Sequence, residues 1–351
     1  MTTNRASETS RTLRVGVIGA GYMGNRYARL AAQHAGTVLS GVMDLDRVRA
    51  ESTCALYGGS AFSSLEQLLD RDVVDAVVVS TFEDAHRDAC LHALNAGLPV
   101  LVEKPIASSI EDARAIVAAA GAARVPLMVG HLLGFDARYS ALRDAVRDPA
   151  FGSPLTATAR RLNGVGAQQR LQGRSSLSVF LGVHDFDLLR WILDDEVVEV
   201  SATARRGHLQ GMGYPVEDAL YATLSFSRGT VAQVELGWIL PSGHPSGFDQ
   251  RMEVTGTAGY GVVDGAFSGF SLATSNRTSW PEMTIASDIG SQLQGSLERS
   301  FSAFIQSCAA GGVSPVTALD GLRALEIADA VERSAFTGTV VSLKSQAGSH
   351  A

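Results

Sequence analysis

The sequence predicts two domains of different class (α/β + α+β): a doubly wound parallel sheet, then an open, mostly antiparallel sheet with helices. The chain has 351 residues, of which 46% are hydrophobic and 19% charged, enough to bury two cores. In the first half, short apolar runs alternate with helical patterns. From about Pro154 onward, strand patterns follow one another, as antiparallel pairing requires.

The first half is expected to form the parallel domain, over residues 13–130. A polar stretch, residues 1–12, precedes it and is expected to be a disordered leader. The expected strands are Leu13–Ile18, Thr37–Met43, Asp72–Ser80, Pro99–Val102 and Pro126–Val129, and the expected helices are Tyr22–His34, Asp84–Asn95 and Ile110–Ala120.

The second half is expected to form a substrate-binding and oligomerisation domain over residues 131–345. Arg228 and Gly229 are expected at the turn of a hairpin, and the Ser-, Thr- and Gly-rich segment 265–295 in long surface loops. The expected strands are Thr156–Arg161, Val197–Arg206, Ala219–Phe226, Thr230–Trp238, Arg251–Thr255 and Gly261–Val263, and the expected helices are Ser178–Leu193, Leu297–Ala309 and Leu319–Ser334.

A glycine-rich motif follows the first strand and opens the first helix, which is the context of a dinucleotide-binding Rossmann fingerprint. It reads Gly19-Ala20-Gly21-Tyr22-Met23-Gly24. Gly19 permits the tight turn, Gly21 lets the backbone approach a pyrophosphate, and Gly24 lets helix and strand pack closely. The pyrophosphate is expected at the helix N-terminus, where N–H groups and the dipole favour an anion.

The end of the second strand indicates which dinucleotide binds. Asp44 follows Gly24 by about 20 residues, where an acidic side chain bonds the ribose hydroxyls of the adenosine. A carboxylate there repels a 2′-phosphate, so NAD is expected and NADP is less favoured. Arg47 lies close by in sequence and weakens that preference.

Composition excludes several other classes of function. A net charge of −7 argues against nucleic acid or an anionic membrane surface as partner. The three scattered cysteines form no CxxC pair, and the histidines show no HExxH spacing, so neither a disulfide framework nor a metal site is expected. A cytoplasmic location fits this cysteine usage.

Further motifs give a resemblance to a known family. Val102-Glu103-Lys104-Pro105 follows a strand, and HDFDLLRWIL surrounds His184. Together with Thr81 and His86, Glu217-Asp218, Gly256-Thr257-Ala258-Gly259 and the closing SAFTGTVVSL, they run in order over Leu13–Leu343. In this the chain resembles the glucose–fructose oxidoreductase / inositol dehydrogenase / MocA family. The resemblance implies an NAD-dependent oxidoreductase acting on a secondary alcohol or ketone of a cyclic polyol, sugar or glycoside-like substrate.

The resemblance also implies roles for individual residues. Lys104 would lie beside the reacting hydroxyl and stabilise its alkoxide, and His184 would take the proton. Two structural alternatives stay open: Lys104 pairing only with a carboxylate, and His184 packing in a core. The cofactor contacts implied are Gly19, Gly21, Tyr22, Met23, Gly24, Asp44, Thr81, His86, Glu103 and Lys104. The substrate contacts implied are Lys104, His131, Arg161, Phe180, His184 and Asp185.

Two positions depart from the family pattern. Phe180 stands where relatives carry Asp, four residues before the histidine, and Gly134 stands where many carry Arg. Both changes remove charge from the substrate side, which predicts a larger, less polar or glycosylated substrate. Asp187, one turn after His184, is expected to orient the imidazole in place of the missing carboxylate.

Other functions and an assembly remain open at this point. A redox-neutral lyase or glycosidase of the same family would hold NAD tightly and produce no net NADH, and a non-catalytic NAD-sensing regulator would tolerate loss of Lys104 or His184. One uncovered sheet face is expected to expose a large apolar patch. Packing two such faces together predicts a homodimer or homotetramer.

Overall fold

The computed structural model describes residues 12–267, 269–274 and 278–343. The expected leader therefore lies outside the described residues except for Thr12. The chain forms two compact units. The first holds the described residues up to Gly130 together with Asp288–Leu293 and Glu298–Leu319, and the second holds His131–Ser287, Gln294–Leu297 and the described residues from Asp320 on.

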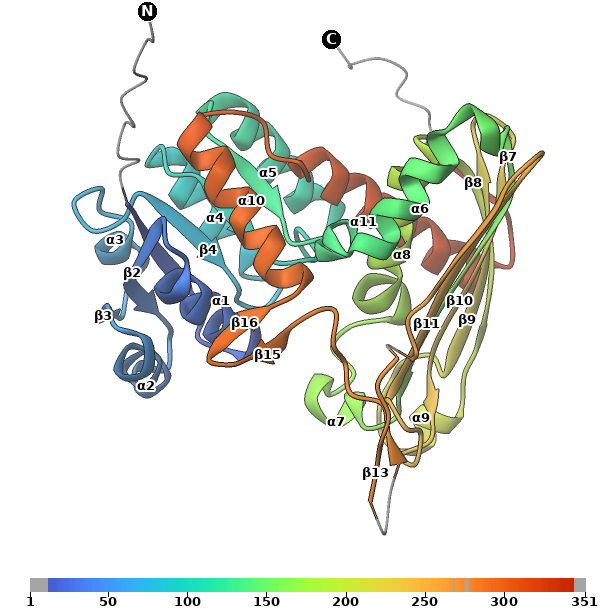
Figure 1. Ribbon diagram of the computed structural model, residues 1–351, viewed down its shortest axis with the longest axis horizontal. Coiled ribbons are helices and arrows are strands. Elements are labelled where there is room, and N and C mark those ends of the chain that lie inside the picture. The colour runs from blue at the N-terminus through green and yellow to red at the C-terminus, as the bar shows by residue number, and fades with distance from the viewer. Residues whose placement is uncertain (1–11, 268, 275–277, 344–351) are drawn as a thin grey trace, which may run out of the picture. The chain divides into compact units, whose positions relative to one another are not determined.

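The first unit contains a six-stranded sheet in which every pair of neighbours is parallel. The spatial order β3-β2-β1-β4-β5-β6 reverses direction between β1 and β4, so the sheet is doubly wound, as predicted (Figure 1). The strands are β1 Leu13–Ile18, β2 Thr37–Met43, β3 Ser60–Phe62, β4 Ala76–Val79, β5 Val100–Val102 and β6 Leu127–Val129.

The helices of this unit include two that the sequence analysis did not predict, α2 and α3. Asp46 caps α2 by accepting from the backbone N–H groups of Val48 and Arg49. The helix buries only Ala50 and Thr53, so it shows no apolar stripe that a periodicity argument detects. The helices are α1 Tyr22–Gln33, α2 Arg47–Tyr57, α3 Leu65–Leu68, α4 His86–Asn95 and α5 Ile110–Ala123.

A segment from near the C-terminus completes the first unit. Helix α10 (Ser296–Ala310) places Phe301 against Tyr27 and His34, with ring centroids 6.3 and 5.9 Å apart. The backbone N–H of Val129 in β6 donates to Val316 O at 3.1 Å. The expectation of one contiguous second domain over 131–345 is therefore wrong for this segment, because α1 and β6 offer it an apolar face and a free sheet edge.

The second unit contains a seven-stranded sheet in the order β12-β11-β7-β10-β9-β8-β17. Only β7 and β10 pair in parallel, and the other neighbours are antiparallel, which confirms the predicted fold class. Gly229, with φ +92°, turns the predicted hairpin between β9 and β10. The strands are β7 Pro154–Gly164, β8 Val197–Arg205, β9 Ala219–Phe226, β10 Val231–Leu240, β11 Phe248–Gly256, β12 Tyr260–Asp264 and β17 Val341–Ser342.

Helices of the second unit cover one face of this sheet, and the figure shows the other face without helices (Figure 1). The expected single helix over Ser178–Leu193 is instead a π-helical turn, η3 Ser178–Gly182, followed by α8 Val183–Leu193. The remaining helices are η1 Leu132–Phe135, α6 Ala137–Arg147, η2 Pro149–Phe151, α7 Ala167–Leu171, α9 His208–Gly211 and α11 Ala318–Thr337.

The segment 265–295, expected to be loops throughout, carries short strands where it is described. These pair as two small ribbons, β13 with β14 and β15 with β16. Gln33 on α1 donates to Ser291 O between β15 and β16 at 2.9 Å. The strands are β13 Leu272–Ala273, β14 Thr278–Ser279, β15 Ser287–Ile289 and β16 Gln292–Gln294.

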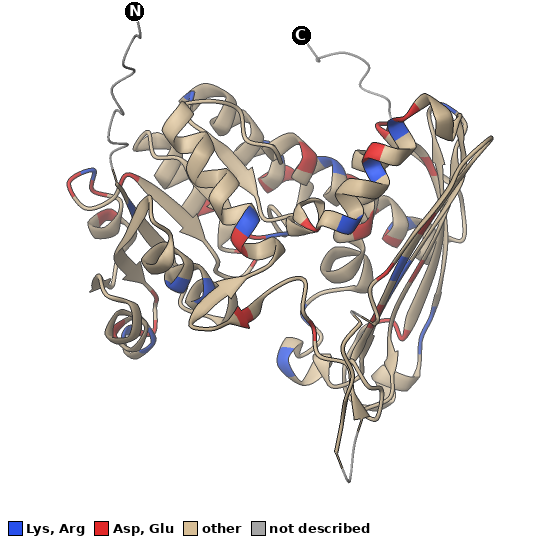
Figure 2. Cartoon of the chain, in the orientation of Figure 1, with Lys and Arg blue, Asp and Glu red and all other residues tan. Residues whose placement is uncertain are grey.

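The bare face of the seven-stranded sheet carries bonded polar pairs together with exposed apolar side chains such as Val231, Ile239 and Val262. The Tyr221 hydroxyl donates to Glu235 at 2.8 Å, and Gln233 donates to Thr223 at 2.8 Å. Residues of both charges occur along these strands (Figure 2). The expected face-to-face pairing through this surface stays a prediction. One row across the strands consists of Thr203, Tyr221, Glu235, Arg160, Arg251 and Asp264.

No helix in the described part of the chain is long and apolar enough to span a bilayer.

The packing of α10 yields a stability prediction. Phe301 is fully buried, so Phe301→Ala is expected to lower the free energy of unfolding by about 3–5 kcal/mol, from lost burial plus the cavity left behind. Chemical denaturation monitored by circular dichroism measures the change. Phe336→Ala is the matched control, because Phe336 is 86% exposed and its loss is expected to change stability by less than about 0.5 kcal/mol. Equal effects of the two variants would contradict the packing role of α10.

Candidate functional site

Two glycines of the glycine-rich loop are required by the protein's own packing. Gly19 has φ +94°, and a Cβ there would lie 2.8 Å from the backbone carbonyl of Ser80. A Cβ on Gly24 would lie 1.7 Å from the Gly19 carbonyl oxygen. The first turn of α1 can therefore press onto the ends of β1 and β4 only where both side chains are absent.

Gly21 is different, because nothing in the described structure competes for its side-chain position. A Cβ there would have no neighbour within 4 Å. Gly21 is the N-cap of α1, no side chain caps this terminus in the described chain, and its first turn carries no acidic residue. Uncapped N–H groups beside open space over a glycine fit the pyrophosphate of a dinucleotide.

Asp44 closes the other side of this loop. Its Oδ2 accepts from Ala20 N at 2.7 Å, and its Oδ1 accepts from Asp46 N at 2.8 Å. The backbone thus fixes a half-buried carboxylate at the end of β2, where ribose hydroxyls would meet it. Arg47 instead pairs with Glu51 at 2.7 Å on the exposed surface of α2.

Tyr22 and Met23, also expected to contact the cofactor, are the first two residues of α1. The Tyr22 side chain is largely exposed, and the Arg26 guanidinium lies over its ring at 3.7 Å from the centroid. Both side chains therefore lie at the N-terminus where the phosphates are expected.

Glu103 is a buried anchor in the structure rather than an open ligand. Its Oε1 accepts from the Tyr27 hydroxyl at 2.8 Å, and its Oε2 accepts from Lys104 N at 3.2 Å. Burial raises the pKa of Glu103, while the Lys104 charge, the Tyr27 hydroxyl and the Lys104 N–H oppose the rise. The expected direct contact with the cofactor stays a prediction, and in the structure the Glu103 carboxylate has a positioning role. It ties the loop after β5 to α1.

His86 joins the loops that follow β4 and β5. Its Nδ1 lies 2.9 Å from Pro105 O, and its Nε2 lies 3.3 Å from Thr81 O. Burial lowers the pKa of His86 against the opposing effect of these carbonyls, which favours a neutral ring at physiological pH. Lys104 precedes Pro105 through a cis peptide bond. The structure thus gathers Thr81, His86 and Lys104 at the carboxyl edge of the first unit's sheet, next to the glycine-rich loop.

In the second unit, His184 is the second residue of α8 and is half-buried. Its ring faces that of His131, with centroids 6.3 Å apart and planes at 86°. His131 is almost fully buried. The structure therefore brings together two of the expected substrate-side residues.

Phe180 lies in the π-helical turn that precedes α8. Its ring packs on Trp238 of β10, with centroids 5.5 Å apart, and Trp238 is fully buried. Nothing in the sequence marks Trp238 as a site residue, because its place in a strand pattern indicates only a core residue. The position where the resemblance to the family implies an Asp is thus part of an aromatic pair.

Arg161 and Asp185 bind each other. Arg161 Nε donates to Asp185 Oδ2 at 2.7 Å and its Nη2 to Oδ1 at 2.9 Å, while Nη1 donates to Gln250 at 2.7 Å. Both residues are less than a tenth exposed. A buried bidentate ion pair engages their charged groups, and the expected contact of either residue with substrate stays a prediction.

Asp187 is buried, and the charged groups that act on it are those of Arg190 and Asp320. Burial raises the pKa of Asp187 to about 7, with Arg190 opposing the rise and Asp320 adding to it. The expectation that it orients the imidazole as a carboxylate gains no support from this arrangement. Gly134 faces Trp191, whose ring atoms lie 3.7 Å from where a Cβ would be.

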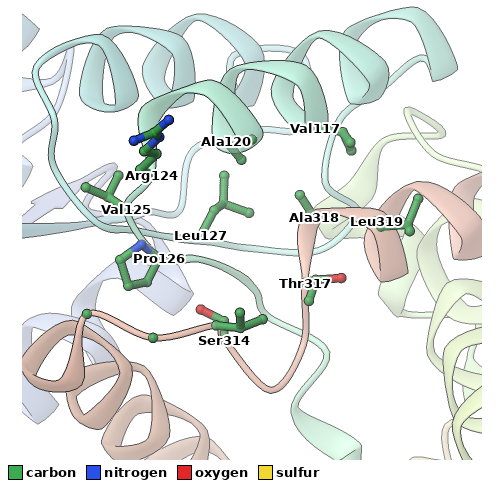
Figure 3. A pocket seen from close by; sticks show the side chains of 14 residues that line it. Val117, Ala120, Arg124, Val125, Pro126, Leu127, Ser314, Thr317, Ala318 and Leu319 are labelled. Carbon is green, nitrogen blue, oxygen red and sulfur yellow. The ribbon is translucent and has the colours of Figure 1, made fainter. Parts of the chain in front are cut away.

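One cavity in the first unit lies apart from these residues. It has a volume of about 430 Å³ and is bounded by the C-terminal half of α5, the amino end of β6 and the 311–319 segment (Figure 3). The glycine-rich loop and Lys104 lie at the carboxyl edge of the same sheet. Among the described residues, no three His, Cys, Asp or Glu side chains are placed to hold a metal ion.

Comparisons with known proteins identify relatives of both units. A family model described as "Oxidoreductase family, NAD-binding Rossmann fold" matches residues 13–131, and a "GFO/IDH/MocA C-terminal domain" model matches residues 139–261. Inositol 2-dehydrogenase 2 of Saccharopolyspora erythraea is 29% identical, over 95% of this chain and 96% of that protein. A 1,5-anhydro-D-fructose reductase of Ensifer adhaerens is also 29% identical, over 94% and 98%. The crystal structure of a myo-inositol dehydrogenase from Corynebacterium glutamicum is 26% identical, with a TM-score of 0.80, over 95% of this chain and 99% of that one.

In the glycine-rich loop, Gly21 is expected to serve cofactor binding and Gly24 to serve packing. Gly21→Ala is expected to raise the Kd for NAD by about tenfold or more, because the methyl group occupies the space for the pyrophosphate. Its thermal midpoint without NAD is expected to stay near the wild-type value. Gly24→Ala is the matched control, and its Cβ clash is expected to lower that midpoint. Calorimetric titration and thermal unfolding measure the two effects, and a loss of stability in Gly21→Ala would contradict the assignment.

Asp187 yields a pH prediction. Between about pH 4 and pH 7 the unfolded chain carries an ionised Asp187 while the folded chain keeps it protonated, so stability falls as pH rises through this window. Asp187→Asn is expected to remove this fall and to gain on the order of 3 kcal/mol relative to wild type by pH 8. Urea unfolding at pH 5 and pH 8 measures the gain. Asp329→Asn, at an exposed carboxylate paired with Arg333, is the control. Parallel pH curves for wild type and Asp187→Asn would contradict the shifted pKa.

Proposed function

The chain belongs to the GFO/IDH/MocA family of NAD-binding oxidoreductases, and from this premise we propose that it acts on a secondary alcohol or ketone of a cyclic polyol, sugar or glycoside. Bound NAD would supply the hydride acceptor. The glycine-rich loop, the α1 terminus and Asp44 would hold it, as their open backbone N–H groups and fixed carboxylate suggest.

We assign proton transfer to Lys104 and His184. A neutral imidazole has a pKa suited to taking a hydroxyl proton near pH 7. An ammonium group beside the same oxygen stabilises the alkoxide as it forms. The observation that supports Lys104 is its fixed place at the carboxyl edge of the sheet. On one side Glu103 accepts from Lys104 N and from the Tyr27 hydroxyl. On the other side His86 contacts the carbonyl of Pro105.

The names of the relatives support the substrate class. The inositol 2-dehydrogenases and the 1,5-anhydro-D-fructose reductase are named for polyhydroxylated rings. A CH–OH group on such a ring is a chemically reasonable substrate for a neutral imidazole and an ammonium group.

Within this class we propose a larger, less polar or glycosylated substrate. The single observation that carries this proposal is the Phe180–Trp238 pair, which stands one turn before His184. An aromatic ring offers a stacking surface to the C–H face of a sugar, whereas a carboxylate would bind a free hydroxyl. The ion pair between Arg161 and Asp185, which engages the charged groups of both residues, supports the same preference.

A spectrophotometric screen of NADH production tests the reaction. Inositols, free sugars and glycosides are offered to the wild-type enzyme, and at least one ring alcohol is expected to support turnover. Lys104→Met and His184→Asn are each expected to lower kcat by about 10²- to 10⁴-fold with NAD affinity retained. Unchanged turnover in both variants would overturn the roles assigned to these residues. Glycoside cleavage without net NADH would favour the redox-neutral alternative.

A second variant tests the substrate preference. Phe180→Asp restores a carboxylate before His184 and is expected to shift the ratio of kcat/KM values toward free inositols by about tenfold or more. Wild-type enzyme is expected to prefer glycosides. If wild type oxidises myo-inositol as efficiently as every glycoside tested, the proposed preference is wrong.

A further inference from the structure

The cavity of about 430 Å³ in the first unit is not used by the proposed reaction. Its walls come from three segments of this unit: the second half of α5, the amino end of β6 and residues 311–319 (Figure 3). The glycine-rich loop lies at the carboxyl edge of the same sheet, away from the cavity. A volume of this size lies within the range of small-molecule sites in proteins.

Most of the wall is apolar. Val117 and Ala120 line the cavity from α5, Leu127 lines it from β6, and Ala318 lines it from the 311–319 segment (Figure 3). Gly121 leaves space on the α5 side, because a Cβ there would meet no atom within 4 Å. Walls of this kind gain free energy when they bury the apolar body of a ligand.

One polar side chain in the wall, Ser314, has an unmet hydrogen-bonding capacity. It is only 4% exposed, and its hydroxyl has no hydrogen-bond partner in the described part of the chain. Native structures rarely leave a buried hydroxyl in this state, because its desolvation is then uncompensated. A water molecule is held firmly only by two or more polar partners, which a mostly apolar wall supplies poorly. A ligand with a polar group on an apolar body meets both conditions.

The charge around the cavity favours an anionic polar group. Arg124, the C-cap residue of α5, belongs to the lining and is exposed to solvent. None of the fourteen lining residues is acidic. Asp320, which directly follows the lining in sequence, pairs with Arg190 at 3.6 Å. A carboxylate can therefore accept from the Arg124 guanidinium without competition from an acid in the lining.

We propose that this cavity is a second ligand site, which binds a small organic carboxylate with an apolar body. The apolar part packs against α5 and β6, the carboxylate accepts from Arg124, and the Ser314 hydroxyl donates to an oxygen of the same ligand. This site goes beyond the proposed function, because none of its residues is assigned to NAD or to substrate. Its 311–319 wall is bonded to the sheet, where Val129 N donates to Val316 O at 3.1 Å. Occupancy is therefore expected to stabilise the packing of this wall on β6.

Isothermal titration calorimetry of the full chain with hydrocinnamate, a phenyl ring on a short aliphatic carboxylate, tests the site. One saturable site per chain is expected, with a Kd in the millimolar range or below. The uncharged amide of the same shape, hydrocinnamamide, is expected to bind about fivefold more weakly, because it lacks the charge that Arg124 recognises. Hydrocinnamate is also expected to raise the thermal midpoint until the site is saturated. Saturating NAD is expected to change the Kd for hydrocinnamate less than about twofold, because the glycine-rich loop lies at the other edge of the sheet.

Three variants test the parts of the site separately. Arg124→Gln is expected to weaken hydrocinnamate by about fivefold and to leave hydrocinnamamide within about twofold of wild type. Ser314→Ala is expected to weaken both probes by about threefold. Gly121→Leu fills the cavity with a good helix former and is expected to abolish binding of both probes, with the thermal midpoint at or above the wild-type value. Arg333→Gln, at an exposed arginine of the second unit that pairs with Asp329, is the control and is expected to bind both probes as wild type does.

The same measurements can overturn the proposal. It is wrong if hydrocinnamate shows no saturable binding to wild type, or if NAD displaces it. Equal affinities of wild type and Gly121→Leu would place the probe outside the cavity. Equal affinities of wild type and Arg124→Gln for hydrocinnamate would exclude a carboxylate site. Turnover of Lys104→Met and His184→Asn bears only on the proposed function, so failure of one proposal is distinguishable from failure of the other.

Discussion

The approach of Gly24 to the Gly19 carbonyl is the constraint on which the first unit depends. It lets α1 start directly at the end of β1, and this places the helix N-terminus over the edge where β4 and β5 also end. Tyr27, one turn further along α1, then reaches the Glu103 carboxylate and fixes the loop that carries Lys104. One backbone contact between two glycines therefore aligns the nucleotide-binding loop with the residue assigned to the chemistry.

In the second unit, a comparable role belongs to the π-helical turn before α8. Glu332 on α11 accepts from the hydroxyls of Ser176 and Ser178 at the start of this turn. The wider turn carries Phe180 toward Trp238 while α8 presents His184 to His131. π-Helical turns interrupt regular packing and are common near functional sites. Here Phe180, which packs on Trp238, lies within the π-helical turn. His184, which faces His131, lies one turn later in α8.

The sequence predicted well what periodicity and glycine chemistry determine. The parallel strands, the β9–β10 hairpin and the Gly19–Gly24 motif carry strong local signals. Helix α2 was not predicted because it buries almost no apolar stripe. The π-helical turn was not predicted because its residues fit an α-helical pattern equally well. The ion pair between Arg161 and Asp185 was not predicted, for another reason. Alternation predicts which face of a strand a side chain takes, but not that its charge is neutralised by a partner from another element.

The polar pairs on the bare face of the second unit's sheet were not predicted either, since a sheet covered on one side need not be apolar on the other. Its rows of bonded Tyr, Glu, Gln and Thr side chains satisfy one another across strands. Pairs of this kind stabilise a sheet in water without a covering layer. The strands therefore gain their order from the inner core and from lateral contacts together.

The passage of α10 into the first unit has a consequence for how the chain is made. Translation delivers β1 to β6 early, yet the face of α1 that receives Phe301 stays uncovered until the ribosome has passed Leu319. The nucleotide-binding half is thus the first to emerge and among the last to be finished. A nascent chain halted after Gly130 would present an open apolar surface to chaperones, and the two halves of the enzyme would mature together rather than in turn.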